Sequence, residues 1–300
     1  MTTILSSSSD HSFDPILHAE GSNYFWRGVG QLSIKTFRNG RSFYNTGNGH
    51  YSVDEGNYLL LNQGQEYSIT IESEKPVESF CIFFPEGMVE EIYRSFVTSS
   101  EQLLDNPMDY HPLTLEFVEK TYTHNVLTPV LFQMRDEYQH RRNDRIWVEE
   151  QLHDIAQKLI LVHRDVMKEM MNLPVVRTST RQELYKRVLV GHEFISAYYD
   201  QPISLADMSK VACLSPNHFL RTYKQLFGMS PHQYLTEKRL QEAKQLLLKT
   251  DKSVTTICLE VGLQSPSTFS GLFSKRFSSS PSQLRQRKLG DTKPLAPVEP

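Results

Sequence analysis

One segment near the C-terminus carries a run of polar side chains on one face of a predicted helix. Its amide, imidazole, guanidinium and ammonium groups can donate hydrogen bonds and neutralise phosphate charge. Apolar residues at helical spacing, Phe219, Tyr223 and Phe227, occupy the opposite face. This chemistry suits a polyanionic surface such as DNA. The outward residues are Asn217, His218, Arg221, Lys224 and Gln225.

Helix-start signals predict the elements that position this face. Ser204 predicts an N-cap, because Asp207 stands three residues further on, where its carboxylate can complete a capping box. A short helix, a tight turn over 212–214 and a second helix that begins after Ser215 follow. This order is helix-turn-helix geometry, which we expect over about 204–227.

The same unit recurs further along the chain. Ser204 and Ser253 match at an offset of 49 residues, and Ser215 and Ser265 match at an offset of 50. Apolar positions and Ser-Pro pairs repeat with them, which indicates two copies of one helical unit. A second helix-turn-helix is therefore expected over about 253–277.

The chain resembles the AraC family of bacterial regulators from about residue 203 to residue 287. The matching letters are SLADMSKVACLSPNHFLRTYKQLFGMSPHQYL and RLQEAKQLLLKTDKSVTTICLEVGLQSPSTFSGLFSKRFSSSPSQLR. The resemblance implies two helix-turn-helix units that are rigidly joined by a central helix, expected over 231–249. It also implies recognition helices in successive major grooves on one face of the DNA.

The resemblance implies a role for individual side chains. Arginine can donate two hydrogen bonds to guanine, and asparagine can pair with adenine. The expected base-reading residues are Asn217, Leu220 and Arg221, with His218 beside them, and Ser267, Thr268 and Ser270 in the second unit. The expected phosphate contacts are Ser215, Lys224, Ser265, Lys275 and Arg276, and the alternative for Arg221 is a phosphate contact alone.

Four positions depart from the family pattern. Cys213 stands where the first turn usually has glycine, and Leu263 replaces a usual phenylalanine. Gly271 replaces a frequent basic residue, and Ser278-Ser279 replaces a corner that contains glycine. Since Gly271 has no side chain that could reach a base, we expect the second unit to contribute less base recognition than the first.

Charge divides the chain in the same place. Residues 1–181 hold 16 basic and 25 acidic side chains, for a net charge of −9, whereas residues 182–288 hold 15 and 8, for a net charge of +7. A basic module beside an acidic one indicates that only the C-terminal part meets a polyanion. The alternative is chance clustering on a solvated surface.

The first part of the chain predicts β structure over 22–84. Short apolar runs at 31–37, 58–62, 67–72 and 79–84 are separated by turn signals, among them Lys75-Pro76. The resemblance implies a cupin-like barrel followed by dimerising helices, so the expected fold class is α+β with an all-α C-terminal domain. His50 is followed by Tyr51 and Ser52, which leaves out the second histidine of a metal-binding cupin, and no metal or cofactor is expected.

Aromatic residues are dense in this predicted barrel. They could line a pocket for a small-molecule effector, and the alternative is an ordinary barrel core. The candidate pocket residues are Phe25, Trp26, Phe37, Tyr44 and Tyr51.

A long amphipathic helix is predicted over 146–171, after helices over 86–96 and 130–140. Its apolar spacings approach a heptad stripe, which can pack against the chain's own core or against a second copy. The candidate dimerisation residues are Val148, Leu152, Ile155, Leu159 and Val162.

The expected organisation is a sensing and dimerising domain over 1–171, a linker over 172–181, a DNA-binding domain over 182–288 and a disordered tail over 289–300. No apolar run approaches the roughly 18 residues that span a bilayer, and residues 1–10 do not resemble a signal peptide. The expected location is cytoplasmic. Three cysteines without C-x-x-C spacing, Cys81, Cys213 and Cys258, indicate neither a disulfide framework nor a zinc site.

The function predicted from the sequence is a homodimeric transcription regulator, not an enzyme, and the sequence leaves activation and repression both open. Its expected partners are double-stranded DNA, a second copy of the chain, RNA polymerase and a small-molecule effector, and no membrane. One alternative is a regulator controlled by a protein partner. The other is a DNA-repair enzyme that carries an AraC-like module, which the scattered cysteines do not support.

Overall fold

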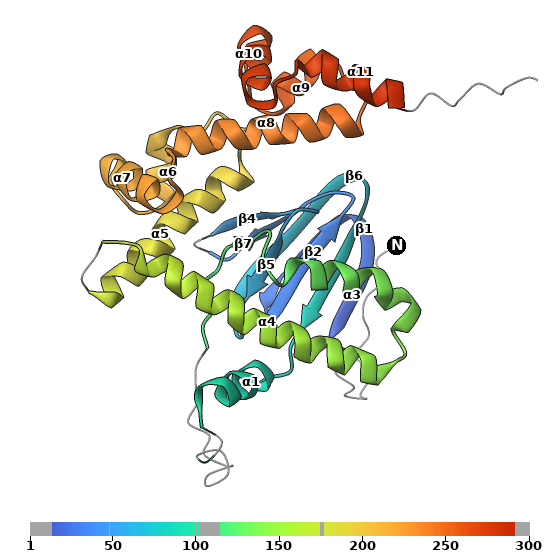
Figure 1. Cartoon of the computed structure of the whole chain (residues 1–300), viewed down its shortest axis with the longest axis vertical. Coiled ribbons are helices and arrows are strands. Elements are labelled where there is room, and N and C mark those ends of the chain that lie inside the picture. The colour runs from blue at the N-terminus through green and yellow to red at the C-terminus, as the bar shows by residue number, and fades with distance from the viewer. Residues whose placement is uncertain (1–13, 48, 100, 102–114, 175–176, 292–300) are drawn as a thin grey trace, which may run out of the picture. The chain divides into compact units, whose positions relative to one another are not determined.

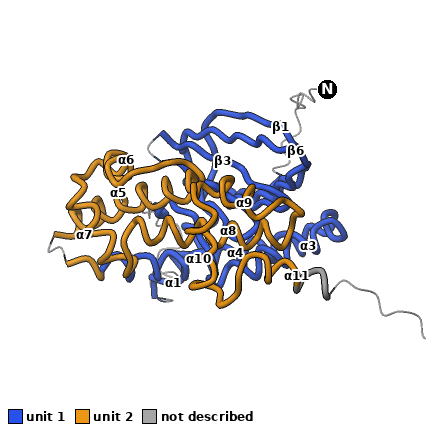
Figure 2. Tube along the Cα trace, turned by 90° about the horizontal axis from the view of Figure 1, so that it is seen from above, with its two compact units in different colours: residues 1–171 blue, residues 172–300 orange. Residues whose placement is uncertain are grey.

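The computed structural model describes residues 14–47, 49–99, 101, 115–174 and 177–291, the last five of them as backbone only. The chain divides into two compact units, Met1–Met171 and Asn172–Pro300 (Figure 2). The expected N-terminal segment 1–10 and most of the expected tail, 292–300, lie outside the described residues.

In the described part of the first unit, seven strands form one antiparallel sheet that is nearly closed, like a barrel (Figure 1). The order is β4-β3-β6-β2-β5-β7, and β1 pairs with β6 off this path. The strands are β1 (Ile16–Val29), β2 (Ser33–Arg38), β3 (Ser42–Asn45), β4 (His50–Val53), β5 (Tyr58–Leu61), β6 (Glu66–Phe83) and β7 (Thr121–Tyr122).

Strand β6 is the spine of the sheet, because it pairs with β1, β2 and β3. The sequence predicted two strands here with a turn at Lys75-Pro76, and that prediction is wrong. The strand continues through Pro76, and the irregularity is taken up as a register shift, with Gly21 opposite Val77 and Asn23 opposite Glu72. Proline has no N–H for the ladder, so a local irregularity is where a strand tolerates it.

The interior of the sheet is filled by aromatic and aliphatic side chains. Three of the five expected pocket residues, Phe37, Tyr44 and Tyr51, are at most 2% exposed and pack with Val53, Leu59 and Ile71. Trp26 packs against this cluster from β1. Phe25, the neighbouring residue on the same strand, is 68% exposed and does not line the interior, since successive side chains point to opposite faces of a strand.

Helices α1 (Met88–Val97), α3 (Thr128–Arg141) and α4 (Arg145–Met171) complete the described part of the first unit. Helix α4 contacts α1 and α3. The five stripe residues expected at a dimer interface are all buried within one copy, between 0% and 8% exposed. The stripe is therefore core of the single chain; apolar spacing alone could not distinguish these two partners. The residues are Val148, Leu152, Ile155, Leu159 and Val162.

The second unit is helical throughout its described elements. They are α5 (Thr178–Ala197), α6 (Leu205–Val211), α7 (Pro216–Phe227), α8 (Pro231–Lys249), α9 (Val254–Glu260), α10 (Pro266–Phe277) and α11 (Pro281–Asp291). Residues 178–181, expected in the linker, form the first turn of α5, because buried Tyr185, Val188 and Leu189 anchor that helix to the core. Residues 289–291, expected in the tail, end α11.

None of the helices within the described ranges is long and apolar enough to cross a membrane.

Candidate nucleic-acid interface

Serine caps start the helices of both predicted units. The Oγ of Ser204 accepts a hydrogen bond from the Asp207 N–H at 3.2 Å, and the Ser204 N–H donates to the Asp207 carboxylate at 2.9 Å. Ser215 caps α7 through the N–H of His218 at 3.3 Å. Each cap satisfies an N–H that the helix itself leaves without a partner, which confirms the predicted helix starts.

The second unit repeats this arrangement. Ser253 caps α9 through the N–H of Thr256 at 3.0 Å, and Ser265 caps α10 through the N–H of Thr268 at 3.3 Å. Proline follows at the first position of α10, as it does in α7. The two helix-turn-helix units are therefore built by the same local chemistry.

The turns adopt one backbone shape with different residues. Cys213 has φ +52° in the first turn and Gly262 has φ +82° in the second. In both, the next N–H bonds back into the preceding helix, Leu214 to the Ser209 carbonyl at 3.0 Å and Leu263 to the Cys258 carbonyl at 2.9 Å. A left-handed residue is required at this position, and only the second unit supplies the glycine that adopts it without strain.

One hydrophobic core holds both units to α8, which lies between them (Figure 1). Phe219 and Tyr223 of α7 and Phe269 and Phe273 of α10 are all 0% exposed. These side chains occupy matching positions in the two helices, so each recognition helix is fixed to the core by the same two rings. This is the predicted apolar face, and it turns the opposite face of each helix outward.

Arg239 of α8 adds a polar anchor that sequence reasoning missed. Its Nε donates to the Tyr199 carbonyl at 2.7 Å, and its Nη2 donates to the Gln201 carbonyl at 2.8 Å. Burial lowers the pKa of its guanidinium. The two bonds tie α8 to the segment after α5, a role that no local sequence signal predicts because its partners are backbone atoms about 40 residues away.

Helix α7 presents unpaired polar groups to solvent. Asn217, Arg221 and Lys224 are exposed, while His218 and Leu220 are half-buried. Among the described residues, none bonds the side-chain amide of Asn217 or the guanidinium of Arg221. These two groups can therefore meet a base without first breaking an internal bond.

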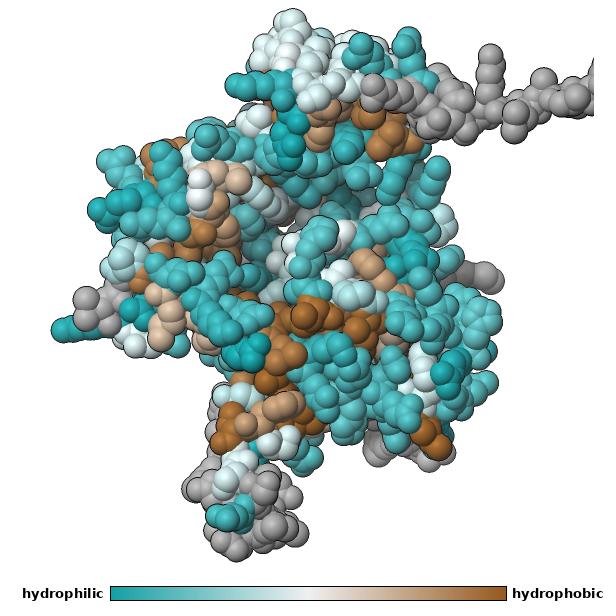
Figure 3. All heavy atoms as spheres, in the orientation of Figure 1, coloured by the Kyte–Doolittle hydropathy of each residue, from teal (hydrophilic) through white to brown (hydrophobic). Residues whose placement is uncertain are grey.

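Helix α10 presents a different surface. Its hydroxyl groups are bonded to their own helix start: Thr268 donates to Ser265 at 3.1 Å, and Ser270 donates to the Pro266 carbonyl at 2.9 Å. Ser267 Oγ lies 3.0 Å from Ser265 Oγ. Gly271 faces open space. The surface over α10 is accordingly pale in Figure 3, as serine, threonine and glycine are neither strongly hydrophilic nor hydrophobic.

The three expected basic phosphate contacts differ in how free they are. Lys224 and Lys275 are exposed. Arg276 instead binds Glu237 of α8, with its Nε 2.8 Å and 2.7 Å from the two carboxylate oxygens. The hydrogen bond with Glu237 raises the pKa of Arg276 and lowers the pKa of Glu237. Arg276 is thus engaged within the protein, because α8 carries an acid that the local sequence of α10 does not reveal.

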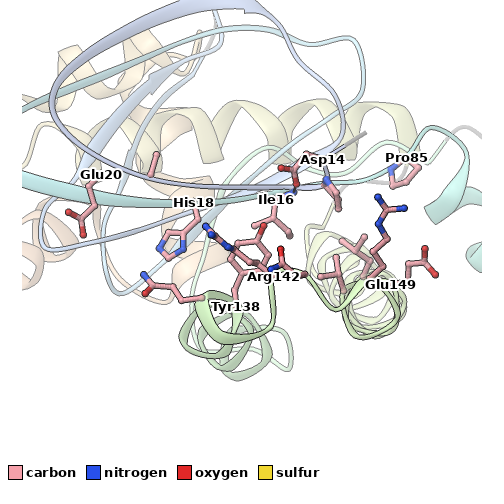
Figure 4. Close-up of a pocket in the computed structure, with 15 residues that line it drawn as sticks. Asp14, Ile16, His18, Glu20, Pro85, Tyr138, Arg142 and Glu149 are labelled. Carbon is pink, nitrogen blue, oxygen red and sulfur yellow. Dashed lines mark hydrogen bonds between the residues drawn. The ribbon is translucent and has the colours of Figure 1, made fainter. Parts of the chain in front are cut away.

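The N-terminal compact unit, Met1–Met171, carries a surface groove of about 1240 Å³ that sequence reasoning also missed (Figure 4). It is bounded by the start of β1, the end of α3 and the start of α4. His18, Tyr138 and Arg142 lie along it, and Glu20 and Glu149 mark opposite ends in Figure 4. The other lining residues are Asp14, Pro15, Ile16, Ala19, Pro85, Gln139, Asn143, Arg145, Val148 and Leu152.

Interactions around the groove fix its aromatic side. His18 Nε2 lies 2.8 Å from the Glu78 carboxylate, and the Tyr138 ring is 5.6 Å from that of Phe80. A tyrosine phenol is already protonated at neutral pH, and burial raises the pKa of Tyr138 further, so its hydroxyl can donate a hydrogen bond. Arg142 and Arg145 have no acidic partner among the described side chains. The groove therefore offers both charges and an aromatic wall to a polar ligand.

No group of three or more histidine, cysteine, aspartate or glutamate side chains that could hold a metal ion occurs within the described ranges.

The C-terminal compact unit is similar to known DNA-binding domains. A family model described as a helix-turn-helix domain matches residues 208–287. The "Probable transcriptional regulator LumQ" of Photobacterium leiognathi is 34% identical over 103 residues, which is 34% of this chain and 41% of that protein. The alignments with the first three relatives cover only 28% to 41% of those proteins' length.

Two further matches differ in their extent. The virulence regulon transcriptional activator VirF of Yersinia enterocolitica serotype O:8 is 24% identical over 244 residues, which is 81% of this chain and 84% of that protein. A solved structure from Chromobacterium violaceum, a transcriptional regulator described by its AraC-type DNA-binding domain, is 28% identical. It covers 37% of this chain and 96% of that one, with a TM-score of 0.32.

Proposed function

Since the C-terminal unit belongs to the AraC family of transcriptional regulators, we propose that this chain binds specific sites on double-stranded DNA and regulates transcription. The observation that carries the proposal is α7: a capped helix, packed by two buried rings, with unpaired Asn217 and Arg221 on its outward face. A helix held in this way can enter the major groove with its hydrogen-bonding groups preorganised.

The two recognition helices divide the work. Helix α7 recognises bases through Asn217 and Arg221, with His218 and Leu220 beside them. Helix α10 meets DNA through Ser267, Thr268 and Ser270, and Lys224 and Lys275 neutralise phosphates. The capped starts of α7 and α10, at Ser215 and Ser265, face the sugar-phosphate backbone of the DNA. The positive end of each helix dipole there favours a phosphate anion.

The proposal includes partners beyond DNA. A second copy of the chain doubles the contacts with a paired site and raises affinity by local concentration. Because the α4 stripe is buried in one copy, this contact uses other surfaces. RNA polymerase is the partner through which a bound activator acts.

The N-terminal unit modulates this activity. Its groove has an aromatic wall, unpaired Arg142 and Arg145 and an apolar floor that includes Ile16 and Leu152, a combination that suits a polar small-molecule effector. The volume of about 1240 Å³ exceeds that of a typical small-ligand pocket. This favours, as a second candidate, an extended segment of a regulatory protein in the same groove.

Selection of randomised DNA duplexes by the full-length chain tests the proposal. We expect a recurrent sequence to be enriched and its affinity to fall steeply as salt rises, because lysine and arginine contacts release counterions. Arg221→Ala should lose preference at one or two base pairs of that sequence. Enrichment of no sequence, or affinity that is independent of salt, would contradict the proposed function.

A further inference from the structure

A buried lysine lies inside the sheet of the first unit. Lys35 is in β2, directly opposite Cys81 of β6 on one side and Leu59 of β5 on the other. It is two residues from buried Phe37, so both side chains point to the same face of the strand. Only 2% of Lys35 is exposed, which is exceptional for a lysine.

The ammonium group has no counter-charge. Among the described residues, no carboxylate lies within ion-pair distance of Lys35, and no group accepts a hydrogen bond from it. Its Nζ instead lies 3.9 Å from the ring centroid of Phe83 and 5.6 Å from that of Tyr67. The facing titratable groups, Cys81 and Tyr67, are themselves kept neutral, since burial raises the pKa of each.

Burial without an acid favours the uncharged amine. Desolvation lowers the pKa of Lys35, because the charged form loses its hydration and gains only ring faces in exchange. A neutral primary amine is a nucleophile, and apolar surroundings are how proteins activate lysine for attack on carbonyl carbon.

The amine is close to solvent despite its burial. Phe83, whose ring centroid lies 3.9 Å from Nζ, is the last residue of β6 and is partly exposed. The amine therefore lies beside a side chain that reaches the surface. On the inner side, the Tyr67 ring lies 4.9 Å from Trp26 and 5.7 Å from Tyr44, which makes the surroundings aromatic and apolar.

We propose that Lys35 is a covalent binding site for a small apolar aldehyde. The amine nitrogen forms a bond with the carbonyl carbon, and the carbonyl oxygen takes up a proton as the nitrogen loses one. The resulting carbinolamine expels water and leaves an imine, with no oxidant or reductant required. The reaction is reversible, which suits an effector that must also leave. As a regulatory device it rests on the proposed function, but the reactivity of the amine does not.

Reductive trapping tests the site. The full-length chain is incubated at neutral pH with butanal and cyanoborohydride, which reduces an imine to a stable secondary amine, and each lysine is followed by peptide mass spectrometry. We expect Lys35 to be alkylated at least about tenfold faster than the exposed Lys224 and Lys275, because burial favours the uncharged amine of Lys35. The rate should saturate with butanal concentration, because the aldehyde binds before it reacts.

A rate at Lys35 equal to or below that of the exposed lysines, or one that rises linearly with butanal, would overturn the proposal. Phe83→Ala is expected to accelerate alkylation of Lys35 alone, because it uncovers the amine. DNA affinity is measured on the same protein by fluorescence anisotropy. If the untreated chain does not bind DNA while Lys35 is rapidly alkylated, the proposed function is wrong; if it binds DNA while Lys35 is not preferentially alkylated, the aldehyde site is wrong.

Lys35→Met supplies a second measurement that does not use an aldehyde. The folded pKa of Lys35 lies below its unfolded value, so the unfolded chain binds more protons and stability rises with pH up to the unfolded value, about 10.4. Lys35→Met lacks this dependence. Its thermal midpoint should exceed that of the wild type most at low pH and converge with it as pH rises; a constant difference would show that the amine is not neutralised by folding.

Discussion

The two helix-turn-helix units have the same internal construction and different outer surfaces. Both begin their helices with serine caps, and both bury two aromatic rings at matching positions. On the outward face, α7 carries free Asn217 and Arg221, whereas α10 carries hydroxyl groups that bond to its own first turn and a glycine without any side chain.

The difference shows which positions the fold constrains. Caps and buried rings recur because each unit needs them to satisfy N–H groups and to hold its second helix against α8. The outward side chains of α7 and α10 are not part of the hydrophobic core, so a repeat can change them without loss of core packing. We therefore expect base recognition to be concentrated in α7, although the two helices are otherwise built alike.

The turns provide the most severe test of this comparison. A Cβ at Gly262 would lie 2.6 Å from the Asp200 carbonyl oxygen, and the backbone there has φ +82°. We expect Gly262→Ala to destabilise the second helix-turn-helix unit by about 2–4 kcal/mol, from the left-handed strain and the collision together. Hydrogen exchange of α9 and α10 in the full-length chain measures the loss.

The matched change in the first unit is Cys213→Gly. Its φ of +52° already strains a residue with a Cβ. Removal of that strain, less the added chain entropy of glycine, should stabilise the first helix-turn-helix unit by up to about 1 kcal/mol. Destabilisation by Cys213→Gly, or tolerance of Gly262→Ala, would mean that the two turns are not equivalent.

The second test concerns base recognition. Arg221→Ala should cost about 1–3 kcal/mol of affinity for the selected duplex and relax preference at one or two base pairs. Thr268→Ala in α10 is the comparison in the other recognition helix, and it should cost less, since its hydroxyl is bonded to Ser265. Selection on randomised duplexes measures both. Equal sequence information in the two half-sites would refute the division of work between α7 and α10.

The sequence predicts the C-terminal compact unit, Asn172–Pro300, far better than the N-terminal one, Met1–Met171, for physical reasons. Serine caps and Ser-Pro pairs act within one helical turn, so Ser204 and Ser215 could be recognised as helix starts from neighbouring letters. Arg276 shows the limit even there, because its partner Glu237 is 39 residues away. In the N-terminal compact unit, the strands pair with partners that are remote in the sequence. Neither the passage of β6 through Pro76 nor the burial of Lys35 has a local signal.

The third test uses the glycine in α10. A Cβ at Gly271 would meet nothing within 4 Å, so alanine fits without rearrangement. Glycine inside a helix costs about 1 kcal/mol relative to alanine, and Gly271→Ala should stabilise the second helix-turn-helix unit by about that amount. The base preference selected from randomised duplexes should not change, since a methyl group cannot form hydrogen bonds. An altered preference would place residue 271 in contact with bases.

The smallest effect separates two adjacent cations at the end of α10. Lys275 is exposed without an acidic partner among the described residues, whereas Arg276 is bonded to Glu237 through both carboxylate oxygens. Each cation that neutralises a phosphate contributes about one to the slope of log affinity against log salt concentration. Lys275→Ala should therefore reduce this slope by about one. Arg276→Ala should reduce it by less, since its charge is already compensated by an acid within the protein. Glu237→Gln should have the opposite effect and steepen the slope, because it frees Arg276 to meet a phosphate. Equal reductions from the two alanine variants, with no effect of Glu237→Gln, would show that the Arg276–Glu237 pair opens when DNA binds.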